Sequence, residues 1–216
     1  MKIKSNLDEM LYDRIIEQLI SGRYAAGQKL TLDELAQTFE VSRTPVVQAV
    51  KRLSGDGVLQ VYSNGRIYVP DFDPETIRQI CETRRLIEGY ALERFMSGQG
   101  MKEESILPQL RLYAEQCERF WVEENRVAFA TADRKLHRTL VQASGNSVLL
   151  ELYTRGQGRF TVANYMSRPL SRRDFQGTLA DHTALLQAIS ERDMERAIGL
   201  LHNHIDRAFL AVSKEP

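Results

Sequence analysis

Hydrophobic and polar positions in the first 70 residues predict helices followed by a β-hairpin. In residues 7–22 the apolar side chains recur at intervals of three and four, which is the spacing of one face of a helix. That face consists of Leu7, Met10, Leu11, Ile15 and Leu19. Gly22 follows the last of them and can end the helix. The segment is therefore expected to form one amphipathic helix.

Two shorter helices are expected next, each with a recognisable start. Thr31 and Glu34 have the spacing of a capping box, in which the threonine hydroxyl accepts an amide hydrogen bond and the glutamate reaches back. Ser42 is a suitable N-cap for the following helix, and Pro45 falls in its first turn, where a missing amide proton costs nothing. The inward side of this third helix is expected to carry Val46, Ala49, Val50 and Leu53.

A hairpin is expected after the third helix, which stops at residues 55–57. Two β-prone runs, 58–62 and 66–70, flank the pair Asn64–Gly65, and both of these residues tolerate the positive φ of a tight turn. Three helices and a hairpin by residue 70 have the outline of a winged helix-turn-helix.

The rest of the chain has helical period throughout. A linker is expected over residues 70–76, where two prolines and two aspartates interrupt the pattern and Asp73–Pro74 can start a new helix. Breaks follow near 97–100, Ser144–Gly145, 167–169 and 191–193, and no stretch alternates like a strand. We therefore predict a mainly α protein, with an N-terminal winged helix-turn-helix domain (residues 1–72) and a C-terminal all-α helical bundle (residues 73–216).

Composition says more about the compartment in which the protein acts than about the partner that it binds. The 29 basic and 29 acidic residues cancel, so the overall charge does not indicate a nucleic-acid partner. Cys81 and Cys117 form no CxxC pair and fit a reducing compartment. The sequence has no apolar run long enough for a membrane span and no signal-peptide pattern, so we expect a soluble cytoplasmic protein without a membrane partner.

Charge becomes informative around the third helix and the hairpin. Residues 42–66 contain four basic side chains against the single acid Asp56, a local net charge of +3. Opposite the inward stripe, helical spacing places Arg43, Thr44, Val47, Gln48 and Lys51. Any solvated helix carries some basic residues, but the nearby hairpin with Arg66 at its turn favours a DNA-contacting face.

The run 35-LAQTFEVSRTPVVQAVKRLSGDGVLQVYSNGRIYV-69 resembles the DNA-binding domain of the GntR family of bacterial transcription regulators, with its LA…VSRTPV…A…L…G signature. The similarity covers nearly all of residues 7–70. In that family the start of the third helix and the wing contact operator DNA. By matching positions, the resemblance implies DNA contacts from Arg43, Thr44, Lys51, Asn64, Gly65 and Arg66.

Val47 departs from the family pattern, which usually continues VSRTPVRE with an arginine that contacts a base. Such an arginine can make a bidentate contact with guanine, worth about 1–3 kcal/mol of discrimination, whereas valine can touch a thymine methyl. Alternatively, Val47 packs beneath the wing as neutral filler. Gln48 can contact an adenine edge or remain solvated, and Asp33 stands where some members have a further arginine near the phosphates. An altered operator is expected, not lost binding.

The helical part carries polar side chains on faces that are expected to be buried. Asp133 and His137 are four residues apart and project from one face as a chelating pair. His182 lies in line with the apolar stripe of its own segment. Periodicity hardly separates His202 from His204, but apolar neighbours one turn away make His204 the expected inward residue.

One inward histidine is more often a satisfied core group than a ligand. Burying three with an aspartate would cost several kcal/mol without compensation, and a shared divalent ion satisfies all of them together. A divalent metal site is therefore expected in the bundle, with zinc as the ion and nickel, manganese or iron as alternatives.

Most of residues 74–213 resemble the FCD domain, the ligand-binding domain of the FadR-like branch of the GntR family. The matching points are 82-ETRRLIE-88, Asp133 with His137, 144-SGN-146, His182 within 181-DHTALLQAI-189, and His204 before Ile205. In metal-binding members these positions imply the ligands Asp133, His137, His182 and His204. Other members lack the metal and bind acyl-CoA.

Arg84 lies on an apolar stripe, so its permanently charged guanidinium points into the bundle and needs an anion. Glu88, one turn on, is one candidate partner. The alternative that we adopt is a carboxylate effector held by Arg84 and by open positions of the metal, which three histidines and one aspartate need not saturate.

These features predict a homodimeric transcription regulator, a repressor, whose affinity for operator DNA is controlled by a small carboxylate metabolite at the metal site. One alternative is a metal-dependent hydrolase, in which the ion activates water. Another is a regulator that senses the metal itself. The hydrolase is disfavoured because no separate carboxylate is placed convincingly as a general base and no enzyme needs the DNA-contacting face.

Overall fold

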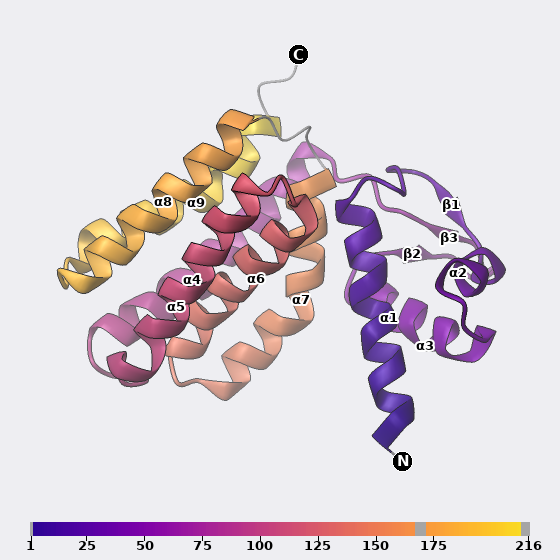
Figure 1. Ribbon diagram of the computed structural model, residues 1–216, viewed down its shortest axis with the longest axis horizontal. Coiled ribbons are helices and arrows are strands. Elements are labelled where there is room, and N and C mark those ends of the chain that lie inside the picture. Colours follow the sequence, from indigo (N-terminus) through magenta and orange to yellow (C-terminus); the bar gives the residue numbers. More distant parts are fainter. Residues whose placement is uncertain (1, 167–171, 213–216) are drawn as a thin grey trace. The chain divides into compact units, whose positions relative to one another are not determined.

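Figure 1 shows the computed structural model of the protein, which describes residues 2–166 and 172–212. Nine helices and three short strands in these ranges make the protein mainly α, as predicted. Contacts divide the chain into two units, one with the described residues of 1–72 and 158–166 and the other with those of 73–157 and 172–212. None of the described helices is long and apolar enough to cross a membrane.

Apart from residues 158–166, which are the end of a later helix, the first unit contains three helices and a small antiparallel sheet. Its elements are α1 (Lys2–Ile20), β1 (Lys29–Leu30), α2 (Leu32–Phe39), α3 (Arg43–Gly55), β2 (Gln60–Val61) and β3 (Ile67–Tyr68). The strands lie in the order β1, β3, β2. The predicted hairpin is β2 with β3, whereas β1 was not expected, because a two-residue strand gives no period and forms only by pairing with β3.

The core of this unit lies where α1 and α2 pack on α3. Val46, Ala49, Val50 and Leu53 are buried, which confirms the predicted inward face of α3. Leu11, Ile15 and Leu19 of α1 are buried as well, but Met10 is 46% exposed. The prediction for Met10 was wrong because Tyr12, Ile16 and Ile20 complete the buried face of α1 on its other side.

The two predicted helix starts differ in how they are capped. At α2 the capping box is present, with the Glu34 amide donating to Thr31 Oγ1 (3.2 Å) and the Thr31 amide donating to Glu34 Oε2 (2.9 Å). At α3, Ser42 occupies the N-cap position, but its side chain makes no capping hydrogen bond. Ser42 is exposed, and its hydroxyl does not stabilise the helix start.

The hairpin turn is looser than predicted. Only Gly65 has positive φ (77°), and its amide donates to the Tyr62 carbonyl at 2.9 Å. Asn64 contributes through its side chain, whose Oδ1 accepts the Arg66 amide at 3.1 Å. The turn therefore spans residues 63–65, and Asn64 contributes as a hydrogen-bond acceptor without adopting positive φ.

The remaining helices are α4 (Pro74–Met96), α5 (Glu103–Val122), α6 (Arg126–Ala143), α7 (Ser147–Met166), α8 (Arg172–Ser190) and α9 (Met194–Val212). The start at Asp73 is confirmed, because its side chain accepts the Thr76 amide. The expected breaks at 97–100, 144–145 and 191–193 are confirmed, while 167–169 lies outside the described residues. An unpredicted break separates α5 from α6, where Glu124 has positive φ and Asn125 caps α6.

Packing of the helices places five of them, α4, α5, α6, α8 and α9, around one interior. α4 packs against α6 and α9, α8 packs against α9, and α5 packs against α6 and α8, which Figure 1 shows as a set of neighbouring helices. Apolar side chains fill most of this interior, including Ile77, Leu92, Phe129, Leu140 and Leu201. Charged and polar side chains from α4, α6 and α8 are buried among them.

Replacing Thr31 by alanine should destabilise α2, because it removes the hydroxyl that accepts the Glu34 amide (3.2 Å) and donates to Glu34 Oε2 (2.8 Å). We expect the free energy of local opening at α2 to fall by about 1 kcal/mol in Thr31→Ala. Amide hydrogen exchange of the full chain, followed by mass spectrometry, measures this quantity. Ser42→Ala is the matched control and should change exchange at α3 much less. Equal losses for the two variants would show that the capping box of α2 contributes nothing of its own.

Candidate functional site

The predicted DNA-contacting residues are exposed on α3 and on the wing of the first unit. Arg43, Thr44, Gln48 and Lys51 are exposed along α3, and Asn64, Gly65 and Arg66 are exposed at the tip of the wing. Val47 is 38% exposed on the same face of α3. Part of its side chain is therefore open to a ligand.

Not all of the local positive charge lies free on this face. The Arg52 guanidinium stacks over the Tyr12 ring, with its carbon 4.4 Å from the ring centre, and lies 4.0 Å from Asp56. Arg43 lies 3.4 Å from Asp33, a pair that is largely exposed and therefore weak. Arg52 thus belongs to the contact between α1 and α3, and the cationic contacts of the face reduce to Arg43, Lys51 and Arg66.

Sequence reasoning missed one aromatic residue of the wing. Tyr62 is 54% exposed, and its ring meets Tyr68 edge to face at 5.4 Å. Tyr62 and Tyr68 line a pocket of about 370 Å³ with Gln60, Asn64 and Arg66. The β-prone composition of residues 58–62 predicted the strand but not which of its faces would be covered.

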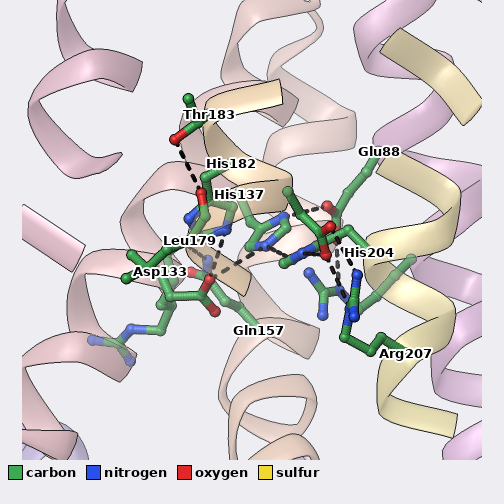
Figure 2. Close-up of polar contacts among 12 residues, drawn as sticks. Glu88, Asp133, His137, Gln157, Leu179, His182, Thr183, His204 and Arg207 are labelled. Carbon is green, nitrogen blue, oxygen red and sulfur yellow. Dashed lines mark hydrogen bonds and ion pairs between the residues drawn. The ribbon is translucent and has the colours of Figure 1, made fainter. Parts of the chain in front are cut away.

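The second unit brings together the four predicted metal ligands. Asp133 and His137 come from α6, His182 from α8 and His204 from α9 (Figure 2). One donor atom from each lies within 4.8 Å of the others. His137 Nε2 is 3.0 Å from His204 Nε2 and 3.6 Å from Asp133 Oδ1, which in turn is 3.2 Å from His182 Nε2. His202 lies outside this cluster.

Two further carboxylates contact two of the histidines. Glu88 of α4 accepts a hydrogen bond from His137 Nδ1 at 2.6 Å, and Asp181 of α8 faces His204 Nδ1 at 3.3 Å. With Nδ1 assigned as the donor in both rings, both Nε2 atoms point to the centre of the cluster. Arg207 donates to both oxygens of Asp181, at 2.8 and 3.0 Å. This is the arrangement that commonly supports metal-ligating histidines.

Burial and charge set the protonation of the cluster. Burial opposes charge on His137, but the carboxylates of Glu88 and Asp133 raise its pKa to about 9. Burial, opposed by the hydrogen bond with Asp181, lowers the pKa of His204 to about 4. Near neutral pH, His137 can therefore donate from Nε2 to the bare Nε2 of His204.

Contacts within the cluster leave some of its buried polar atoms without hydrogen bonds, and a divalent cation would pair with them better. Asp133 Oδ1 and both ring nitrogens of His182 are buried, yet none of them makes an aligned hydrogen bond. Such orphaned atoms are costly in an apolar interior. A cation in place of the proton shared by His137 and His204 would satisfy all four side chains, and imidazole nitrogens with one carboxylate form a usual donor set for divalent transition metals.

Arg84 has a protein partner on one side of its guanidinium. The residue is 8% exposed, and its Nε donates to Glu88 Oε1 at 2.7 Å. Tyr153 of α7 donates its hydroxyl to the same oxygen at 2.9 Å. The Glu88 pairing considered from the sequence is therefore present. The terminal nitrogens of Arg84 make no hydrogen bond to any residue in the described part of the chain.

Several residues of the site had no role in the sequence prediction. Asp181 directly precedes a ligand, which was the one available signal for it. Tyr153 and Arg207 were missed because their partners are 65 and 26 residues away in the sequence, and no local pattern reports such contacts. Glu88 was weighed only as a partner for Arg84, since nothing in the sequence placed it against His137.

Both domains match known families. The FCD domain family matches residues 79–207, and the bacterial regulatory proteins of the gntR family match residues 7–69. The gluconate operon transcriptional repressor of Bacillus subtilis (strain 168) is 24% identical over 193 residues, covering 88% of this chain and 78% of the relative. The galactonate operon transcriptional repressor of Escherichia coli (strain K12) is 24% identical over 220 residues, covering 86% and 89%.

The fold agrees with that assignment. The crystal structure of a GntR transcriptional regulator from Rhodococcus sp. RHA1 superposes with a TM-score of 0.81 at 18% identity and covers 100% of each chain. The matched families and relatives are transcriptional regulators and not enzymes, which removes the hydrolase alternative. The chain therefore belongs to the GntR family of bacterial transcriptional regulators and carries an FCD domain after its DNA-binding domain.

Proposed function

We propose that this regulator is a homodimeric repressor whose operator affinity is controlled by a small carboxylate bound beside a divalent metal in the helical bundle. The observation that carries the proposal is the convergence of Asp133, His137, His182 and His204 next to a buried arginine. A structural core has no need of so many buried polar groups with unsatisfied atoms. A ligand site does.

The DNA-binding part of the proposal rests on the exposed residues of α3 and the wing. Arg43 and Gln48 carry side chains that can hydrogen-bond base edges, and Val47 offers a methyl surface suited to thymine. Lys51 and Arg66 supply positive charge for phosphates. Because the chain as a whole is neutral, binding would depend on these few contacts more than on bulk attraction.

The metal-binding part of the proposal rests on the set of donor atoms and on the two carboxylates that contact the histidines. Three imidazoles and one carboxylate suit zinc, and nickel, manganese and iron are the other candidates. When bound, the ion would supply open coordination positions for the oxygens of a carboxylate. Glu88 and Asp181 would keep His137 and His204 oriented toward it.

The carboxylate-binding part of the proposal rests on Arg84. Its Nε is fixed by Glu88, while its terminal nitrogens remain available for a second anion. Since Glu88 also bonds His137, the guanidinium is only two hydrogen bonds away from a ligand of the proposed metal. The named relatives regulate operons for gluconate and galactonate, which are small carboxylates, and this supports the same class of effector here.

Exposed apolar side chains support a homodimer. On α4, Leu86 (75% exposed) and Tyr90 (47%) lie one turn apart on the side away from Arg84 and Glu88. On α7, Val148 (65%) and Leu152 (58%) are also one turn apart. Such pairs favour contact with a second copy, and a dimer would present two winged domains to half-sites about one helical turn apart or less. A chain that sediments as a monomer at micromolar concentration would contradict this.

Location and mode of control complete the proposal. A transcription regulator acts where the bacterial chromosome is, and Cys81 and Cys117 are buried thiols that form no disulfide, as expected in the reducing cytoplasm. Effector and operator would be coupled by about 1–3 kcal/mol, and each would change the affinity of the other by the same factor. The alternative is a regulator that senses only the metal, but that function does not explain why the terminal nitrogens of Arg84 are left for a second anion.

Operator recognition is tested with variants of α3. Arg43→Ala should lose specific binding because a base contact disappears. Lys51→Ala should weaken binding to all sequences alike, and the slope of log affinity against log salt concentration should fall by about one, the value for one phosphate contact. Shift assays at controlled salt on a selected operator measure both effects. Arg43→Ala that binds this operator as tightly as the parent would refute the assignment.

The same assay, run on randomised sites, examines Val47. Val47→Arg should shift preference toward guanine at one position in each half-site. If the selected motif does not change, Val47 does not contact a base.

The metal site is tested by elemental analysis of gently purified protein. The parent should contain about one divalent ion per chain. His182→Ala and His204→Ala should lose most of it, because each removes a ligand. His202→Ala is the matched control, since it removes a nearby histidine of α9 that lies outside the cluster, and it should retain the ion. A parent that takes up no ion on reconstitution with zinc, nickel, manganese or iron would sink the proposed site.

The carboxylate effector is tested with Arg84→Lys. Lysine can still donate to Glu88, so metal content should be kept, but it lacks the guanidinium fork and carboxylate affinity should fall about tenfold, or about 1.4 kcal/mol. Arg85→Lys, at the exposed neighbouring position, is the control. Calorimetric titration of sugar acids and other metabolic carboxylates into the metal-loaded proteins, with and without operator, gives the affinities.

Two outcomes of these titrations would contradict the proposal. Carboxylates could bind the parent and Arg84→Lys equally, which would leave Arg84 as a structural partner of Glu88. Carboxylates could also fail to change operator affinity while the ion alone changes it, which would favour the metal sensor.

A further inference from the structure

Glu88 is the most completely buried acid of the bundle and has three partners from three helices. It is 0% exposed on α4. Its Oε1 accepts hydrogen bonds from Arg84 Nε at 2.7 Å and from the Tyr153 hydroxyl at 2.9 Å. Its Oε2 lies 2.6 Å from His137 Nδ1. The two oxygens therefore have different tasks, and only Oε2 faces a metal-ligand candidate.

These contacts leave little freedom for the His137 ring. The permanently charged guanidinium of Arg84 is buried against Glu88 and donates to its Oε1, as does the Tyr153 hydroxyl, so the group is a carboxylate and can only accept hydrogen bonds. His137 Nδ1 must then carry a hydrogen, whether the ring is neutral or charged. The other nitrogen, Nε2, is the one that faces Asp133 and His204.

The other two histidines of the cluster are held less firmly. Asp181 lies 3.3 Å from His204 Nδ1, and it is itself partly exposed beside the half-exposed Arg207. His182 has no hydrogen-bond partner at Nδ1 within the described part of the chain. Of the three imidazoles, His137 is thus the one whose tautomer and ring plane are fixed by a short bond to a fully buried carboxylate.

We propose that Glu88 is the positioning residue of the metal site, which it serves by fixing the Nδ1–H form of His137 and by joining that ring to Arg84 and Tyr153. This inference rests on the proposed function, because the site it serves is the proposed metal and anion site. Glu88 would not contact the ion or the carboxylate. It would act through His137 on one side and through Arg84 on the other.

The substitution Glu88→Gln separates this role from simple packing. Arg84 Nε and the Tyr153 hydroxyl both donate to Oε1, so the amide oxygen must take that place. The amide NH₂ then faces His137 Nδ1, which has to accept a hydrogen bond. A neutral ring that accepts at Nδ1 carries its hydrogen on Nε2, where it blocks metal ligation. A side chain of nearly the same shape would thereby impose the wrong tautomer.

The first measurement is ¹⁵N NMR of histidine-labelled full-length protein with and without zinc. In the parent, His137 Nδ1 should carry a hydrogen in both conditions, whereas in Glu88→Gln without zinc it should not. Zinc affinity, measured by competition with a chelator, should fall about 10–100-fold in Glu88→Gln. Glu82→Gln is the matched control, since it makes the same change on an exposed part of α4 that does not reach the cluster. It should leave both readouts unchanged.

Tyr153→Phe supplies a second variant that keeps the ring and the packing. It removes one donor to Oε1 but leaves Arg84 in place, so His137 should keep its Nδ1 hydrogen while zinc affinity falls only a few-fold. The proposal is overturned if His137 Nδ1 keeps its hydrogen in Glu88→Gln and the zinc affinity stays within twofold of the parent. A parent that binds no zinc sinks the proposed metal site instead, and the His137 spectrum then still decides whether Glu88 fixes the tautomer.

Discussion

The bundle depends on one constraint, which is that charge buried in an apolar interior must be matched by opposite charge or by hydrogen bonds. Arg84, Glu88, His137 and Asp133 satisfy it as a connected series of alternating positive and negative groups. The series joins α4 to α6, and Tyr153 and His204 attach α7 and α9 to it. Removing one member would leave its neighbour as an uncompensated buried charge, a loss of about 3–5 kcal/mol. The same groups therefore hold the helices in place and would form the proposed ligand site.

Sequence periodicity was a good guide wherever a local rule decides the structure. The inward face of α3, the capping box at Thr31 and the start of α4 at Asp73 depend on residues within about two turns of each other, and all three are present. Predictions became wrong where tertiary packing selects among local options. Met10 fits the helical stripe but lies at its exposed edge. Ser42 occupies the N-cap position of α3 as predicted, although its side chain makes no capping hydrogen bond.

The same distinction applies to the site. Asp133 and His137 could be paired from their spacing, because residues four apart share a face. That His182 and His204 join them follows from the packing of α8 on α9, which sequence spacing alone does not give, so the resemblance to a known domain was needed there. Glu88 and Tyr153 show the limit most clearly. Their contacts span 49 and 65 residues, and a buried glutamate in a helix has no signature that names its partner.

Arg84 is where the two ligands of the proposed site would meet, and its geometry determines the sign of their coupling. Because Nε is the atom bound to Glu88, an anion at the terminal nitrogens would not have to break the existing ion pair. The desolvation of the guanidinium has already occurred in the folded protein, so the anion gains a preorganised, weakly hydrated partner. An ion at the histidine cluster would add positive charge close by and stabilise the same anion further. Metal and carboxylate should therefore bind with positive cooperativity, and the transcriptional response would require both to favour the same arrangement of the dimer.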